Sequence, residues 1–133
     1  MRTPLPAVAV VIGFINAINR GDVDRLVALM SPGHRLQVLQ EPPVTGREAN
    51  RGAWNGYLTA FPGYVIYPDH IVHRDDEVLV LGSTTGSHLG LSDQEERQLK
   101  VIWRATVHDG LLARWQVIED TPGQRALLGL ADQ

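Results

Sequence analysis

Two adjacent carboxylates, Glu119 and Asp120, end the stretch RWQVIED at residues 114–120 and are the first groups that could carry chemistry. Because side chains alternate along a strand, Glu119 shares a face with Trp115 and Val117, while Asp120 lies on the other face. A carboxylate whose pKa is raised by an apolar wall can act as a general acid or base at neutral pH. The pattern therefore predicts one catalytic candidate, Glu119. The alternative is a solvated residue at the end of a strand.

His88 lies in the stretch GSHLG, where the flanking glycines favour a loop edge over a core position. An imidazole at such an edge can titrate near neutral pH, which makes His88 a second catalytic candidate; a structural or surface role is the alternative. His70 and His73 are three residues apart on a predicted strand and point to opposite faces, so we do not expect them to share a metal ion. We expect no metal and no other cofactor.

Four large amphipathic aromatic residues could line an apolar pocket: Trp54, Tyr57, Trp103 and Trp115. The indole N–H of Trp54 and the hydroxyl of Tyr57 would be its few polar groups. The alternative is that the four rings simply fill the core.

Size and composition indicate one globular domain spanning residues 1–133, in which 44% of residues are hydrophobic and 20% are charged. The net charge is −3 and Lys100 is the only lysine, whereas a nucleic-acid surface would need a basic stripe. The early apolar run AVAVVIGFI, at 7–15, is too short to span a membrane. The chain has no cysteine, which fits a reducing compartment. We therefore expect a cytoplasmic protein that binds neither nucleic acid nor membrane.

Helical spacing of apolar residues dominates the first half of the chain. Thr3-Pro4 is typical of a helix start, and Gly21 ends that helix. Asp22 is predicted to cap a second helix, which SPG at 31–33 ends, and RLQVLQ at 35–40 predicts a short strand. TGRE at 45–48 has the pattern of a capping box, which opens a third helix that ends at Pro62-Gly63.

From residue 64 the period changes to two, which predicts four successive strands at 64–73, 77–88, 97–107 and 111–119. Short turns join three of them, an acidic polar loop at 92–96 lies between the second and third, and TPGQRALLGL at 121–130 predicts a last short helix. Helices followed by an antiparallel meander indicate the α+β class. Such a sheet curves around the helices and leaves a cavity wherever side chains fail to fill the space.

The order of these segments resembles the SnoaL-like branch of the nuclear transport factor 2-like superfamily. The run TAFPGYVIYPDHIVHRDDEVLVLGSTTGSHLG at 59–90 is similar, without a gap, to a family segment in which a helix ends in F-P-D and the second of two strands ends in G-T-H-T-G. Further similarities are GREA at 46–49, RGDVDRLVALMSP at 20–32 and RWQVIEDTPGQRALLGL at 114–130. The resemblance implies a conical barrel of three N-terminal helices held in a curved antiparallel sheet, with Trp115 facing inward and Glu119 at the pocket mouth.

The catalytic residues of two related enzyme classes are absent from the matching positions. In ketosteroid isomerases the general base falls at Gln37, and the oxyanion donors fall at Phe14 and at Ile102 or Trp103. Glutamine cannot accept a proton at neutral pH and phenylalanine cannot donate a hydrogen bond. Limonene epoxide hydrolases need an Arg-x-Asp where this chain has Ser83-Thr84-Thr85, and an acid at Val117.

The resemblance therefore implies a pocket more firmly than a reaction. We expect the pocket to be lined by Phe14, Gln37, Trp54, Tyr57, Trp103, Trp115 and Val117, with Glu119 and Gln37 orienting a polar group of the ligand. The expected ligand is an apolar, polyketide- or steroid-like molecule, isomerised or cyclised by acid–base chemistry without a cofactor. The alternatives are a non-catalytic binding protein and a dimerising scaffold. Apolar residues on both strand faces also predict a homodimer, through Ile66, Ile71, Val72, Leu79 and Leu81.

We predict that the purified protein neither isomerises Δ5-ketosteroids nor hydrolyses small epoxides at enzyme-like rates. Loss of a general base alone typically lowers a rate by about 10²–10⁴-fold. Steady-state assays with both substrate classes test this expectation. Robust turnover of either one would mean that Phe14, Gln37 and Val117 do not occupy the positions assigned to them.

Overall fold

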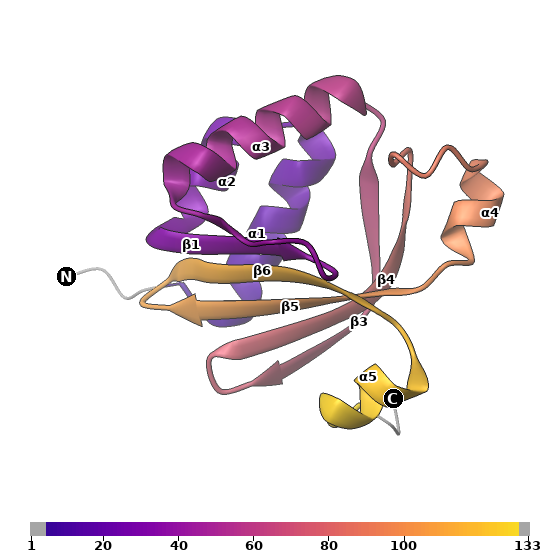
Figure 1. Cartoon of the computed structure of the whole chain (residues 1–133). Helices are drawn as coiled ribbons and strands as arrows, with labels where there is room; N and C mark the ends of the chain where they lie inside the picture. The colour runs from indigo at the N-terminus through magenta and orange to yellow at the C-terminus, as the bar shows by residue number, and fades with distance from the viewer. Residues whose placement is uncertain (1–4, 131–133) are drawn as a thin grey trace.

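The computed structural model describes residues 5–130, in which two helices precede the first strand and three more lie later in the chain (Figure 1). The helices are α1 (Ala7–Arg20), α2 (Val23–Leu29), α3 (Arg47–Ala60), α4 (Asp93–Arg97) and α5 (Pro122–Leu127). The strands are β1 (Met30–Val38), β2 (Val44–Thr45), β3 (Val65–Arg74), β4 (Glu77–Thr85), β5 (Val101–His108) and β6 (Leu111–Glu119). The predicted helix start at Thr3-Pro4 lies outside the described residues. Within them, no helix has the length and apolar character needed to cross a bilayer.

The boundary between α1 and α2 follows the sequence signals, whereas the start of α3 does not. Gly21 has φ of 68°, a left-handed conformation that glycine adopts at little cost, and it ends α1. The carboxylate of Asp22 accepts the backbone N–H of Arg25 and caps α2. The predicted capping box at Thr45 is wrong, because Thr45 pairs with Arg35 in the sheet and no side chain caps α3. Pairing with a distant strand thus places Thr45 in the sheet, although the local sequence pattern assigned it to the start of the helix.

All six strands form one curved sheet in the order β2-β1-β6-β5-β4-β3, which confirms the α+β fold class. The sheet stays open, with β2 and β3 at its two edges. Four of the five strand pairings are antiparallel, but β1 runs parallel to β6, which corrects the fully antiparallel expectation. A parallel pair needs a long connection between its strands, and the chain from α3 to β5 supplies it. β1 also begins at Met30, so the SPG segment belongs to an irregular strand.

The sheet has two faces with different coverings. The inner face packs against α1, α2 and α3 and forms the larger core, which includes Phe14, Trp54, Trp103 and Trp115. On the outer face a smaller cluster is buried beneath the C-terminal segment, and its members are Leu79, Leu81, Ile102, Ile118 and Leu130. Figure 1 shows α5 on the side of the sheet away from α1 and α3.

This arrangement changes the basis of the predicted homodimer. Ile66 and Ile71 pack with the inner core, while Leu79 and Leu81 are buried against Leu130 of the same chain. These four side chains are therefore not the exposed apolar surface from which a dimer was expected. The homodimer stays a prediction.

Polar contacts at the chain's C-terminal end hold α5 on the outer face. Thr121 accepts the backbone N–H of Gln124 and caps the helix, and the guanidinium of Arg125 forms two hydrogen bonds with Asp120, of 2.6 and 2.9 Å. Arg74, at the end of β3, donates to the carbonyl oxygens of Leu128 and Gly129. The hydrogen bonds from Arg125 lower the pKa of Asp120 below its ordinary value. Asp120 is thus a structural acid, on the face opposite to Glu119.

We predict that Asp120→Asn lowers the free energy of unfolding by about 1–2 kcal/mol, because it replaces charge-assisted hydrogen bonds with weaker ones. Since the pKa of folded Asp120 is lowered, its contribution is present at neutral pH and is lost as pH falls through that pKa. Urea unfolding of wild type and variant at pH 7 and in acid measures both effects. Glu119→Gln is the matched control, because that carboxylate forms no hydrogen bond or ion pair among the described residues; an equal loss in both variants would contradict the prediction.

Candidate functional site

Four buried aromatic rings from different elements meet on the inner face of the sheet, and we call them the aromatic floor: Phe14, Trp54, Trp103 and Trp115. The ring of Phe14, from α1, lies 5.0 Å from Trp115 and 6.0 Å from Trp54 between centroids. Trp103 and Trp115, on the neighbouring strands β5 and β6, stack with centroids 6.4 Å apart. The rings therefore pack on one another, as the core-filling alternative expects.

The aromatic floor nevertheless contains polar atoms that lack partners. The indole nitrogens of Trp54 and Trp103 are buried and have no acceptor among the described residues. The ring of His34 lies beside Phe14, and its Nδ1 is hydrogen-bonded to the carbonyl oxygen of Leu112 at 2.7 Å. Its Nε2 has no partner among the described residues. Burial lowers the pKa of His34, so the ring is neutral, Nδ1–H donates and Nε2 is left as an acceptor. Each such orphaned group costs stability, about 1–3 kcal/mol.

Beside the floor the inner face becomes only half-buried, at the end of the sheet where α3 ends. We call this region the cone mouth and define it by Leu36, Tyr57, His88, Val101, Val117 and Glu119. Leu36, Val101 and Val117 pack against the core yet keep part of their surface exposed. Glu119 follows Val117 on the same face by alternation, pairs with Val101 on β5 and is exposed; at this strand end Val117 and Glu119 also line a groove beneath α5. An apolar wall with one free carboxylate therefore borders the floor.

Gln37, predicted to orient the ligand, does not belong to this wall. In the register of β1 with β6, Leu36 lies opposite Trp115 and Gln37 lies opposite Gln116. Since Trp115 faces the core, Leu36 faces inward and Gln37 faces outward. The prediction was one residue out of register along β1, and a shift of one residue moves a strand side chain to the other face of the sheet.

His88 is held at the cone mouth by Tyr57 rather than by Glu119. The hydroxyl of Tyr57 lies 2.8 Å from Nδ1 of His88 and also accepts the backbone N–H of His88 at 3.3 Å. Burial raises the pKa of Tyr57, so its hydroxyl stays protonated and can donate to Nδ1; in that tautomer of His88 the ring N–H is on Nε2. No hydrogen bond or ion pair joins the carboxylate of Glu119 to His88. The two predicted catalytic residues are thus separate groups.

The loop that carries His88 is fixed by a buried acid that sequence reasoning missed. Glu96, on α4, is 1% exposed, and its carboxylate accepts the hydroxyl of Thr84 and the backbone N–H of Ser87. α4 lies beside the end of β4, beyond the point at which β5 begins to pair with that strand. Residues 92–96 were expected to be a solvated loop, although Ser92 followed by Glu95 is a helix-start pattern that could have predicted α4.

Gly86 allows the same loop to approach the end of α3. It has φ of 71°, and a Cβ at this position would lie only 2.3 Å from the carbonyl oxygen of Gly63. A side chain here would push the loop away from the turn that follows α3. Gly86 and Glu96 therefore set the position of His88 from two sides.

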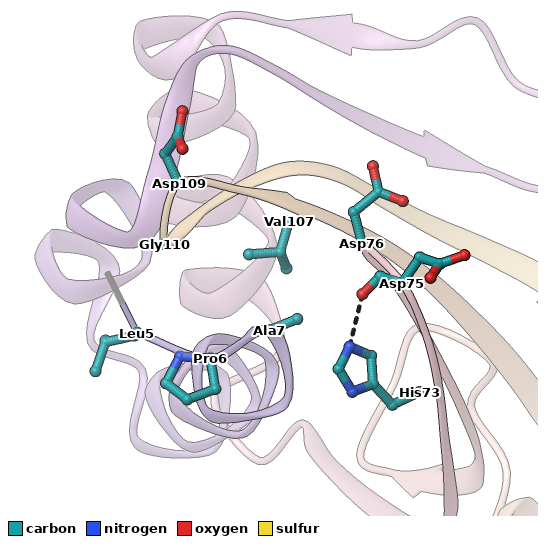
Figure 2. A pocket seen from close by; sticks show the side chains of 9 residues that line it. All are labelled: Leu5, Pro6, Ala7, His73, Asp75, Asp76, Val107, Asp109 and Gly110. Carbon is teal, nitrogen blue, oxygen red and sulfur yellow. Dashed lines mark hydrogen bonds between the residues drawn. The ribbon is translucent and has the colours of Figure 1, made fainter. Parts of the chain in front are cut away.

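A different concave region lies at the opposite end of the strands, where the β3–β4 and β5–β6 turns meet the start of α1 (Figure 2). Its volume is about 380 Å³, with Pro6, Ala7 and Val107 as an apolar wall. Asp75, Asp76 and Asp109 border it, but their carboxylates do not converge on one point in Figure 2. Among residues 5–130 no group of three or more His, Asp or Glu side chains is placed to hold a metal ion. We assign no site to this region.

Comparison with known proteins relates the chain to one family. A model of the SnoaL-like domain matches residues 11–115. Among solved structures, a candidate polyketide cyclase from Sinorhizobium meliloti is 23% identical, with a TM-score of 0.69 over 85% of this chain and 94% of that one. The epoxide hydrolase/cyclase-like enzyme SalBIII, from pyran ring formation in salinomycin, is 20% identical, with a TM-score of 0.70 over 86% and 91%. An uncharacterised cystatin-fold protein from Novosphingobium aromaticivorans is 18% identical, with a TM-score of 0.74 over 86% and 99%. No curated protein matches the sequence.

We predict that Glu96→Gln lowers the free energy of unfolding by about 1–3 kcal/mol, because the amide cannot serve both donors as the buried carboxylate does. The amide protons of Ser87 and His88 should also exchange faster with solvent, since the loop loses its anchor. Urea unfolding and hydrogen exchange measure the two effects. Asp93→Asn, an exposed acid on the same helix, is the control; unchanged exchange at Ser87 in the Glu96 variant would refute the anchoring role.

Proposed function

The chain belongs to the SnoaL-like domain family, and we propose that it binds a small apolar molecule at the cone mouth and acts on a carbonyl group of that molecule by acid–base catalysis. The ligand class is polyketide- or steroid-like, an apolar ring system with few oxygens. Names of fold relatives support this class, since one is a candidate polyketide cyclase and another takes part in pyran ring formation.

The observation that carries the binding proposal is the half-buried apolar wall of Leu36, Val101 and Val117 beside the aromatic floor. An isolated protein gains stability by covering such a surface, and a flat apolar ring system would cover it without needing many polar partners. Trp103 pairs with Val117 of this wall, and its indole N–H, without an acceptor among the described residues, can donate to a ligand oxygen once the ring shifts; the indole of Trp54 belongs to the floor behind it. A ligand with a carbonyl oxygen fits this donor.

The proposed chemistry uses His88 with Tyr57 behind it. With Tyr57 donating to Nδ1, the Nε2–H of His88 is free to donate to a carbonyl oxygen of the ligand. Tyr57 keeps its proton, because burial raises its pKa, and holds His88 as a hydrogen-bond donor to the enolate oxygen that develops on the ligand. Glu119, on the same inner face and free of partners, is the group proposed to remove a proton from the carbon next to the carbonyl. The net change is enolisation, the first step of an isomerisation or aldol-type cyclisation.

A non-catalytic binding protein is the second candidate, and one observation favours it. The carboxylate of Glu119 is exposed and no described residue orients it, whereas an effective base is normally held in place. Binding at the cone mouth needs only the apolar wall. The two candidates therefore differ in turnover and agree on affinity.

We predict that aromatic polyketides with an enolisable carbonyl quench the tryptophan fluorescence of the protein in a saturable way, and that Val117→Asp abolishes this binding by placing a charge in the wall. Steroids belong in the same panel. His70→Asp, an exposed change on the outer face, is the control. Absence of saturable quenching by every compound would overturn the binding proposal.

Turnover is measured as deuterium uptake from D₂O at the carbon next to the carbonyl of a bound polyketide. We expect His88→Gln and Glu119→Gln each to lower the exchange rate by about 10²-fold or more, with affinity within about tenfold of wild type. His70→Gln should leave both quantities unchanged. Saturable binding without accelerated exchange in the wild type would instead establish the non-catalytic candidate.

A further inference from the structure

Two arginines lie side by side on the outer face of the sheet, away from the cone mouth. Arg35 on β1 pairs with Arg114 on β6, and both flank inward residues, so both side chains belong to the outer face. Like charges directly opposite each other on neighbouring strands are destabilising. Neither guanidinium has a hydrogen bond, an acidic partner or an aromatic partner among the described residues. In a chain of net charge −3, this unpaired couple needs an explanation.

The same row of the sheet continues with polar groups. Arg114 on β6 pairs with Thr106 on the neighbouring strand β5. The hydroxyl oxygen of Thr106 is buried and has no hydrogen-bond partner among the described residues. The next cation on this face, Arg104, is different, because it forms hydrogen bonds of 2.6 and 3.0 Å with the carboxylate of Glu77. Unused anion-binding capacity is therefore concentrated at Arg35 and Arg114.

A groove of about 360 Å³ lies on the same face beneath α5, and neither Arg35 nor Arg114 is part of its lining. Gln116, two residues after Arg114 on the same face, lines it together with Gln40 and Gln124, which offer amide donors and acceptors. Its apolar part is formed by Leu39, Val117, Ile118, Leu127 and Leu128, and two charged residues, Arg104 and Glu119, also line it. Leu127 is 82% exposed, and Leu39 is held with φ of 50°, a conformation that is strained for leucine. One end of this surface carries Arg35 and Arg114, and the other is mainly apolar with Glu119 beside it.

We propose that this outer-face groove is a second binding site, and that its occupant is an amphipathic organic anion: a small carboxylate with an unbranched or flat apolar body. The carboxylate lies between Arg35 and Arg114, which can each donate two parallel hydrogen bonds to it. The apolar body lies along Ile118 and beneath Leu127 and Leu128. This occupant relieves the repulsion between the guanidinium groups and covers the exposed leucines at the same time.

Charge argues against a second copy of this chain as the occupant. A two-fold axis through this face would set the couple of one subunit against the same couple of the other, because such an interface repeats one patch on both sides. Glu77, on this face, is already paired with Arg104, and Glu119 lies beside Ile118 in the lining of the groove. A separate anion meets no such repulsion.

The test is calorimetric titration of the whole protein with octanoate, octan-1-ol and inorganic phosphate. We expect octanoate to bind, and the double variant Arg35→Gln/Arg114→Gln to weaken it by about tenfold or more, since charge-assisted hydrogen bonds are lost. Affinity for octan-1-ol should stay within about twofold. Arg20→Gln/Arg25→Gln, which removes the same charge from exposed positions of the helical part, is the matched control and should leave octanoate binding unchanged.

Leu127→Ser tests the apolar half without disturbing a buried residue, and it should weaken octanoate and octan-1-ol together by about threefold or more. Equal loss of octanoate binding in the two arginine double variants would overturn the proposal in favour of non-specific charge attraction. Phosphate binding as tight as that of octanoate would overturn the amphipathic ligand class. A dimer in light scattering that dissociates to 14.7 kDa in Arg35→Gln/Arg114→Gln would make a second copy the occupant and refute the proposal as well.

Discussion

Alternation of side chains across a single curved sheet is the constraint on which the rest of this protein depends. The sheet has no second sheet to pack against, so each face must find its own cover. α1, α2 and α3 cover the inner face, and the segment from α5 to Leu130 covers part of the outer face. Trp115 and Ile118 show the result: they are three residues apart on β6 and belong to different cores. Every functional argument about a strand residue therefore begins with its register.

The unequal lengths of β4 and β5 create the place where chemistry is proposed. β4 extends beyond the last residue that pairs with β5. Along this extension α4 takes the place beside β4 that β5 occupies along the rest of the strand. Glu96 and Arg97 then contact neighbouring residues of β4, with Glu96 on Thr84 and Arg97 on Ser83. Since side chains alternate, the two contacts fall on opposite faces, and the acid points to the side that carries His88. A buried carboxylate thus supports a loop at the edge of the site.

Unpartnered polar groups occur in both halves of the molecule and have the same physical meaning. Among residues 5–130, the buried indole N–H groups of Trp54 and Trp103 have no acceptor, and Arg35 and Arg114 lie opposite each other with no acidic partner. Such groups lower the stability of the isolated chain. Folded proteins tolerate them where a bound molecule restores the missing interaction, which is why the two proposed sites lie at these positions.

Local pattern in the sequence determined the helices-then-strands order, the strand periods, the turn at Gly21 and the assignment of Glu119 and Asp120 to opposite faces, because each of these depends on neighbouring residues alone. It could not determine that β1 runs parallel to β6, since that pairing joins distant segments. The sequence prediction was one residue out of register on β1, and it therefore assigned Gln37 to the inner face instead of the outer one. The roles of Thr45 and Glu96 also depended on distant partners. Thr45 pairs with Arg35 in the sheet, and the carboxylate of Glu96 accepts the hydroxyl of Thr84. Tertiary structure decided these positions because backbone pairing in the sheet holds Thr45 outside the helix, and because the buried hydrogen bonds of Glu96 outweigh a local preference for a polar loop.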